Sequence, residues 1–374
     1  MTDAVLCVDI GTTSLKAGLI TAEGEVVSVC KVKLSLLTDR YHIAQNWLPA
    51  FYRAVKKLAT SLGSASCQKL RILALSLSGN GPTVVTEQGT TILWNEPELK
   101  EKPVFNSPSL FLPKLLVLKK MFEADIAASR YIFSGPEYLI WQLTGKAVTI
   151  LPEERFKSAY WDEELLEKAG IPAEKLASFY KPGQKYGELK SSILEEAGFI
   201  AQSPLPVFGA GPDFVAALIG TATLSPGRLC DRSGSSEGLN LCVPDPLRSP
   251  HVRTLPSVIP GLWNVSCLIP RSGRMSERHR ITALQTALST LRSLAQECGI
   301  DFPKKMLVTG GQTKNAAYMK RKAQALKITL VEANCDDAEL LGDACVAWFG
   351  LGRFSSLQEA AGSIVKEGKA YEGV

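Results

Sequence analysis

The clearest candidates for chemistry lie near the start of the chain, in a polar turn between two apolar runs. Gly11 allows the backbone to approach an anion closely, and Lys16 can neutralise the charge of a phosphate group. The hydroxyl and N–H donors of this turn are Thr12, Thr13 and Ser14. Asp9 can hold Mg²⁺ through water, because Mg²⁺ keeps several waters beside a phosphate group. The turn is a candidate phosphate and metal site, although an ordinary polar hairpin has the same residues.

A second candidate is a carboxylate at a glycine-rich junction between a strand and a helix. Residues 205–208 form a short apolar strand, and apolar residues recur at helical spacing from Val215 onward. Pro212 fits the first helical position, so Asp213 lies in the first turn, where the helix dipole favours an ionised carboxylate. Such a group can act as a general base. The alternative is an aspartate that only stabilises its helix.

Two later stretches have related patterns. Residues 228–243 repeat the opening form of strand, polar glycine turn and strand, and residues 306–326 form a strand, a glycine loop and a helix. The polar and glycine positions of these two turns are Gly234, Ser235, Ser236, Gly310, Gly311, Gln312 and Asn315. Two phosphate-type hairpins in one chain suggest a nucleotide that is held between two lobes.

Two further polar positions are candidate contacts for a substrate. Asn80 lies in a cluster of turn residues at the carboxyl end of the predicted strand 70–77, where α/β sheets usually bind their ligands. Glu96 ends a short predicted strand, 92–96. A tight turn with no ligand explains the residues around Asn80 equally well.

The predicted elements that position these groups are strands and helices in alternation. The turn at Gly11 joins two strands, so a Rossmann or P-loop site, which runs from its glycine loop into a helix, is disfavoured. Residues 46–62 carry apolar side chains at spacings of four, four and three, which predicts an amphipathic helix. Helical patterns also cover residues 112–145, 161–170, 281–298 and 338–351.

Length and composition limit the class of protein. A chain of 374 residues predicts two domains, and the turn at residues 224–227 is the best boundary. A net charge of +5 on a chain of this size gives no indication of a nucleic-acid partner. Nine cysteines without a Cys-x-x-Cys pair indicate reduced thiols in a cytoplasmic protein, and no apolar run reaches membrane-spanning length.

Taken in order, the four motifs resemble those of the FGGY family of carbohydrate kinases, within the actin, hexokinase and Hsp70 fold group. Residues 9–16 resemble the first phosphate motif, and residues 209–213 resemble the loop that bears the catalytic aspartate. Residues 233–236 are similar to the second phosphate motif, and residues 310–315 to the adenosine motif. The resemblance implies an α/β, two-lobed ribonuclease H-like fold of the actin/hexokinase type, with a mixed five-stranded sheet and outer helices in each lobe.

The resemblance also implies an activity. The protein would phosphorylate a hydroxyl group of a sugar, sugar acid or polyol with ATP, with Asp213 as general base and Mg-ATP between the lobes. The N-terminal lobe would be residues 1–226, and the C-terminal lobe residues 227–374. Asp9 would be the metal residue, and Asn80, Glu96 and Asp213 would contact the substrate. A homodimer is left open as the assembly.

Two departures from the family pattern support an alternative. The loop at Asn80 lacks the glutamine, methionine and histidine of many relatives, and Glu96 is followed by proline where relatives have aspartate followed closely by arginine. Gly234 and Gly310 are only 310 − 234 = 76 positions apart, so the second lobe is short. The alternative is a degenerate relative that binds nucleotide as a sensor or partner. A third hypothesis, nucleic-acid binding by the basic run of residues 304–327, is explained better by a solvated helix face.

Overall fold

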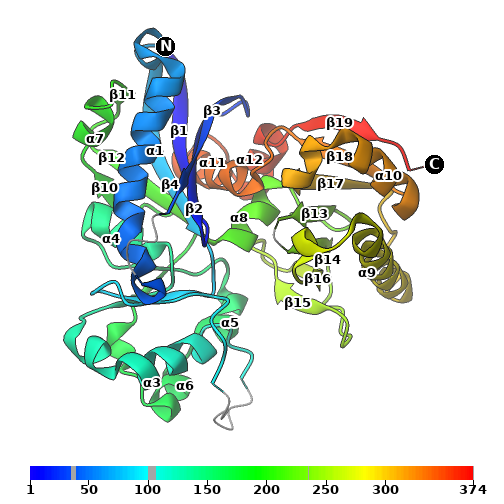
Figure 1. Cartoon of the computed structure of the whole chain (residues 1–374), viewed down its shortest axis with the longest axis horizontal. Helices are drawn as coiled ribbons and strands as arrows, with labels where there is room; N and C mark the ends of the chain where they lie inside the picture. The colour runs from blue at the N-terminus through cyan, green and yellow to red at the C-terminus, as the bar shows by residue number, and fades with distance from the viewer. Residues whose placement is uncertain (35–38, 100–106, 235, 374) are drawn as a thin grey trace.

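The computed structural model describes residues 1–34, 39–99, 107–234 and 236–373. Figure 1 shows two lobes side by side, each with its own sheet, and each of the two sheets has seven strands. The predicted two-lobed α/β fold with helices in each lobe is therefore confirmed. The implied five strands per sheet are wrong, because short edge strands extend both sheets.

The first sheet has the order β10-β12-β4-β1-β2-β3, with β11 paired to β4. Its strands are β1 (Thr2–Ile10), β2 (Ser14–Ile20), β3 (Val26–Lys33), β4 (Leu70–Gly79), β10 (Gly187–Leu189), β11 (Ile200–Ala201) and β12 (Leu205–Pro212). The first three form an antiparallel meander, while β4 runs parallel to β1 and β12 runs parallel to β4. The carboxyl ends of β1, β4 and β12 therefore meet at one edge of the sheet.

Helices cover both faces of this sheet, which is why β1 is apolar on both sides. On one face, α1 (Trp47–Leu62) buries the predicted stripe of Trp47, Phe51, Val55 and Leu58. On the other, α8 (Asp213–Gly220) packs against α11 (Ala338–Gly350), and α11 contacts β1, β4 and β12. A helix from the end of the chain thus completes the core of the first sheet.

The second sheet has the order β15-β16-β14-β13-β17-β18-β19. Its strands are β13 (Leu229–Ser233), β14 (Glu237–Val243), β15 (Arg253–Pro256), β16 (Trp263–Ile269), β17 (Lys305–Gly310), β18 (Thr329–Ala333) and β19 (Glu367–Tyr371). Two helices, α9 (Glu277–Glu297) and α10 (Ala316–Leu326), pack with its apolar face around a separate core. The short interval between Gly234 and Gly310 still supplies the four strands β14, β15, β16 and β17 and the long helix α9.

The remaining elements lie mostly between β4 and β12. The strands are β5 (Val84–Thr86), β6 (Thr91–Ile92), β7 (Ile132–Phe133), β8 (Thr149–Ile150) and β9 (Phe179–Tyr180). The helices are α2 (Ser64–Cys67), α3 (Leu112–Ala128), α4 (Glu137–Thr144), α5 (Lys157–Tyr160), α6 (Glu163–Ala169), α7 (Ser192–Glu195) and α12 (Leu357–Ile364), the last near the chain end. Across the described parts of the chain, no helix combines the length and apolar character needed to cross a bilayer.

Three local predictions are wrong. Of the predicted strand 92–96 only Ile92 lies in a strand, β6 (Thr91–Ile92), because a turn follows in which the Glu96 N–H donates to the Leu93 carbonyl oxygen. The helical stretch 112–145 is interrupted by β7, which pairs with β5. Pro212 is the extended N-cap of α8, with ψ of 140°, and not its first helical residue.

Candidate active site

The hairpin of β1 and β2 places Asp9 opposite Lys16. Its turn is closed by the Gly11 N–H, which donates to the Ser14 carbonyl oxygen at 2.9 Å. The Lys16 Nζ lies 3.3 Å from Asp9 Oδ2, 2.9 Å from Asp337 Oδ1 and 3.7 Å from Glu339 Oε2. Although burial opposes it, these carboxylates hold the pKa of Lys16 above its usual range. The positively charged Nζ of Lys16 therefore lies between the β1–β2 hairpin and the start of α11.

Asp9 is almost fully buried, with 3% of its surface exposed. Its Oδ1 atom is buried and has no hydrogen-bond partner among the described residues. Burial raises the pKa of Asp9, while the neighbouring Lys16 opposes the shift. In the described residues no group of three or more His, Cys, Asp and Glu side chains is arranged to hold a metal ion. One free carboxylate oxygen without a protein cage fits Mg²⁺, which is commonly bound by one or two carboxylates and water.

Asp213 begins α8, directly beyond the end of β12, and is partly buried. Burial raises the pKa of Asp213 to about 6, and Arg232 and Lys16 oppose the shift. Asp9 is also close enough for its own pKa to be raised by Asp213. The structure therefore brings Asp213 together with two predicted residues of the hairpin, Asp9 and Lys16, from which it is more than 190 positions away in the chain.

The predicted substrate loop lies beside this group. Gly79 at the end of β4 pairs with Pro212, and the Asn80 N–H donates to the Ile10 carbonyl oxygen at 2.8 Å. Asn80 is buried, its Oδ1 accepts from the Thr83 hydroxyl at 2.8 Å, and its Nδ2 has no partner among the described residues. An unused amide donor next to Asp213 suits a substrate hydroxyl group.

Glu96 is held differently from Asn80. Its Oε1 accepts from Arg40 Nη2 at 2.9 Å and from the Tyr41 hydroxyl at 3.3 Å. Trp94, two residues earlier, is 41% exposed, and its Nε1 donates to Thr12 Oγ1 at 3.0 Å. The turn after β6 therefore contacts the phosphate hairpin.

A pocket of about 460 Å³ opens on the second lobe. Its lining includes four predicted nucleotide residues, Gly234, Gly311, Gln312 and Asn315, and Ser233 of the second phosphate motif, together with the unpredicted Gly273, Glu277, Arg280 and Tyr318. Ser236 lies outside this lining and accepts from the Arg271 N–H at 3.1 Å. Ser235 lies outside the described residues. The unpredicted residues of the pocket come mainly from α9 and α10, whose sequences contain no glycine-rich or phosphate-binding motif.

Gly310 supports this pocket from behind. It has φ of 97°, and a Cβ atom there would lie 1.8 Å from the Ser233 carbonyl oxygen. A Cβ atom at Gly311 would meet nothing within 4 Å in the described protein. Gly310 is thus required by the packing of β13 against β17, whereas Gly311 is open to the pocket.

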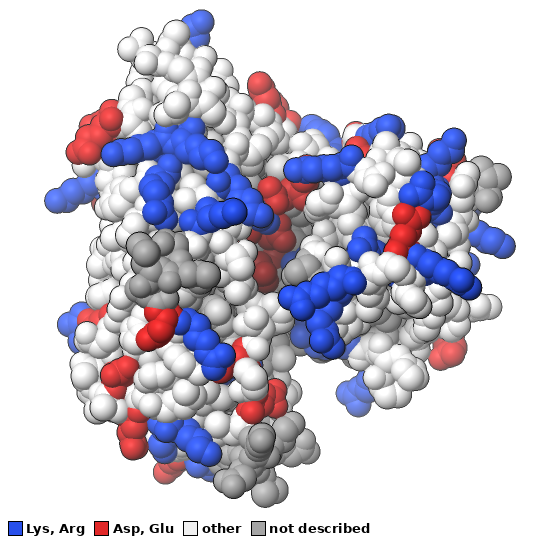
Figure 2. Space-filling model, viewed as in Figure 1, with Lys and Arg blue, Asp and Glu red and all other residues white. Residues whose placement is uncertain are grey.

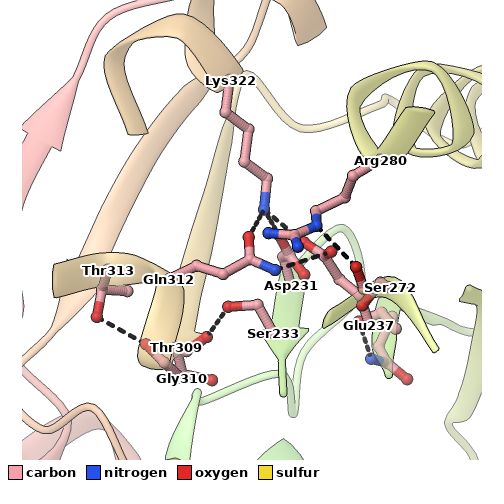
Figure 3. A network of polar contacts seen from close by, with 12 residues as sticks. Asp231, Ser233, Glu237, Ser272, Arg280, Thr309, Gly310, Gln312, Thr313 and Lys322 are labelled. Atoms are coloured by element: carbon pink, nitrogen blue, oxygen red, sulfur yellow. Dashed lines mark hydrogen bonds and ion pairs between the residues drawn. The ribbon is translucent and has the colours of Figure 1, made fainter. Parts of the chain in front are cut away.

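A buried ionic network lies beneath the pocket (Figure 3). Lys322 Nζ donates to Asp231, to Glu237 Oε1 at 2.6 Å and to Gln312 Oε1 at 3.4 Å, and Gln312 Nε2 donates to Glu237 Oε2 at 3.1 Å. All three charged side chains are fully buried. The basic run predicted a solvated helix face, and for Lys322 this prediction is wrong. The network fixes the side chain of Gln312, because both ends of its amide are bonded.

Comparisons with known proteins agree with these motifs. Residues 107–220 match the model of the N-terminal domain of the FGGY family of carbohydrate kinases. The xylulose kinase of Staphylococcus xylosus is 24% identical over 246 residues, which are 58% of this chain and 50% of that protein. The autoinducer-2 kinase of Yersinia enterocolitica is 30% identical over 143 residues, 38% of this chain and 26% of that protein. The chain thus spans half or less of the length of these curated relatives.

Solved structures show the same fold over the whole chain. The glycerol kinase of Plasmodium falciparum, solved with ADP, has a TM-score of 0.79 at 14% identity, with 100% of this chain and 94% of that chain covered. The gluconate kinase of Lactobacillus acidophilus has a TM-score of 0.75 at 16% identity, with the same coverage. These structural likenesses show the fold. The match of residues 107–220 to the family model, together with the ordered motifs, places this part of the chain in the FGGY family of carbohydrate kinases.

Proposed function

We propose that the protein is a carbohydrate kinase that transfers the γ-phosphoryl group of ATP to a hydroxyl group of a sugar, sugar acid or polyol. The observation that carries this proposal is the convergence of Asp9, Lys16 and Asp213 at the edge where β1, β4 and β12 end. The pocket with Gln312 and Asn315 supports it, since it supplies a site for the nucleoside on the other lobe. The kinase names of the related proteins agree with this activity.

In the proposed reaction, Asp213 accepts the proton of the substrate hydroxyl as that oxygen attacks the γ-phosphorus, and the bond to ADP breaks. Phosphoryl transfer needs positioning and charge neutralisation more than covalent chemistry. Lys16 supplies a fixed positive charge, and Asp337 and Glu339 hold its side chain in place. Bound Mg²⁺ would neutralise phosphate charge, and Asp9 is the residue that would hold it. Asn80 would orient the acceptor through its unused Nδ2.

We also propose that residues 1–226 form the N-terminal lobe and residues 227–374 the C-terminal lobe. We further propose that the protein is in a reducing compartment. The packing of α11 on the first sheet supports a joint that brings Asp337 and Glu339 to Lys16. All nine cysteines are free thiols and all belong to the described residues, as expected of a cytoplasmic protein.

The test is a turnover screen with Mg-ATP across pentuloses, hexonates and polyols, with detection of both ADP and phosphorylated product. Asp213→Asn keeps the shape of the side chain but removes the base, so turnover of the best substrate should fall by roughly 10²- to 10⁴-fold. The control is Asp301→Asn, an exposed carboxylate beyond the opposite end of β17. Equal turnover by the Asp213 variant and the parent would refute the role of Asp213. Tight ATP binding without product from any acceptor would instead favour a nucleotide sensor.

A further inference from the structure

One face of the second sheet carries polar side chains that the proposed phosphoryl transfer does not use. Cys230, Asn240, Ser266 and Arg253 are cross-strand neighbours on β13, β14, β16 and β15. Arg232 lies two residues after Cys230, so it projects from the same face of the sheet, because side chains alternate along a strand. The two arginines are thus at opposite ends of one polar surface.

This polar surface faces the first lobe. The other face of β13 carries Asp231, which is bonded to Lys322 of α10. On the polar face, Arg232 Nη2 lies 3.5 Å from Glu339 Oε1 at the start of α11. The guanidinium of Arg253 lies 6.0 Å from the centre of the Phe214 ring, and Phe214 directly follows Asp213. Both arginines are therefore near the proposed base.

The charges on this surface are not balanced within the protein. Arg253 has no carboxylate partner among the described residues, and desolvation by the surrounding protein and the nearby Arg232 lower its pKa. In the same described set, the buried Nε of Arg232 has no hydrogen-bond partner. Asn264, 4% exposed on the same face, has an unpartnered Oδ1. Arg232 is paired with Glu339 through Nη2. The Arg253 guanidinium, the Nε of Arg232 and the amide oxygen of Asn264 therefore remain available to a ligand that carries both an anionic group and hydroxyl groups.

The strand order shows which substrate meets Arg253. The nucleotide pocket is lined by residues at or after the ends of β13, β16 and β17 and does not include Arg253, which lies on the edge strand β15, three strands from β13. Neighbouring strands are about 4.8 Å apart, so β15 is roughly 14 Å from β13. Two long arginine side chains and one small ligand fill this distance. In Figure 2, basic side chains gather on the side of the second lobe that faces the cleft, opposite acidic side chains deep in the cleft. Arg253 therefore lies outside the nucleotide pocket and beside Phe214, the residue that follows Asp213.

We infer that Arg232 and Arg253 form an anion-binding subsite for the acceptor, and that the acceptor is a sugar derivative with a carboxylate or phosphate group. This inference rests on the proposed kinase function, whose acceptor class it narrows. An arginine recognises either group through paired N–H donors in a fixed fork. Arg253 holds the anionic end, while Asp213 faces the hydroxyl that is phosphorylated.

Matched acceptor pairs test the inference with the full chain. D-gluconate and D-glucitol differ only by a carboxylate in place of a hydroxymethyl group, and D-fructose 6-phosphate and D-fructose differ only by the phosphate. Initial rates with Mg-ATP give kcat/KM for each, and calorimetry with an ATP analogue that resists transfer gives the affinities. In at least one pair the anionic member should be preferred by about tenfold or more, the size expected for a hydrogen bond between charged groups. The pair that shows the preference identifies the group as carboxylate or phosphate.

Arg253→Gln should lower the ratio of anionic to neutral kcat/KM by about 10- to 100-fold, and Arg253→Lys should keep part of it. Arg292→Gln, which removes the same charge on α9 beside Phe302, should leave the ratio unchanged. Equal use of both members of each pair, an equal loss for both members in Arg253→Gln, or no binding of any of the four compounds would overturn the inference. If none is phosphorylated but an anionic member still binds through Arg253, the subsite is supported and the kinase proposal fails.

Discussion

Replacing Lys322 by methionine should destabilise the protein strongly, because it leaves two buried carboxylates without their cation. The side chains of Lys322, Asp231 and Glu237 are fully buried, and both carboxylates accept from the same ammonium group. Methionine has a similar length, so the cavity is small and the electrostatic loss dominates. Removing one partner of a buried ion pair typically costs about 3–5 kcal/mol.

The loss should depend on pH in a known direction. Burial and the nearby Glu237 raise the folded-state pKa of Asp231 to about 8, and removing Lys322 removes the positive charge that opposes this shift. Protonation then favours the folded state, so the loss is smallest below about pH 4 and grows as the pH rises toward 8. Urea denaturation followed by circular dichroism at pH 5 and pH 8 measures both effects.

Two comparisons make this prediction sharp. Lys320→Met, on the exposed side of the same helix, should change the free energy of unfolding by less than about 0.5 kcal/mol. Adding Asp231→Asn and Glu237→Gln to Lys322→Met should recover much of the loss, because no buried charge then remains. If Lys322→Met were as stable as Lys320→Met at pH 8, the network would not be the ionic support that its geometry indicates.

Three further outcomes follow from single groups. Because burial raises the pKa of Asp213 to about 6 and only the ionised form is a base, kcat/KM should rise with pH through about 6 and then level off; a flat profile from pH 5 to 8 would contradict this. Gly310→Ala should unfold at much lower urea than Gly311→Ala, since only the former places a Cβ atom against the Ser233 carbonyl and needs a positive φ. Gly311→Val should stay folded and weaken ATP binding in calorimetry. Burial raises the pKa of Glu137 to about 7, so its contribution to stability is full below about pH 4.5 and lost as the pH rises to 7. The side chain of the Glu137→Gln variant does not titrate. Its free energy of unfolding, measured by urea denaturation, should therefore rise relative to that of the parent by up to about 1.4 kcal/mol per pKa unit between pH 5 and pH 8.

Much of the local structure could be predicted because it depends on short patterns. The hairpin at Gly11, the helix of Trp47, Phe51 and Val55, and the junction at Asp213 all combine an apolar period with turn residues next to it. Such signals are complete within about twenty residues. The two-lobed fold was implied by the resemblance of the ordered motifs to those of the FGGY family.

The partners of the predicted residues could not be found in this way. Asp337 and Glu339 bind Lys16 from the opposite end of the chain, and the sequence shows them only as an acidic start to a helix. Lys322 lies in a basic run, where composition favours a solvated face. Its burial depends on Asp231, which is 91 positions away. A charge pattern on one helix does not reveal a carboxylate on a distant strand.

The contact between the lobes at β15 and β16 links lobe position to acceptor recognition. Arg155 of the first lobe stacks on Trp263 at 4.7 Å and donates to the carbonyl oxygens of Ile259 and Leu262. This contact holds the edge of the second sheet that carries Arg253, whereas the nucleotide pocket lies across the sheet. Arg155→Ala should therefore raise KM for the acceptor several-fold and leave the ATP dissociation constant within about twofold. If both constants changed equally, the contact would stabilise the whole lobe and would not specifically position its acceptor edge.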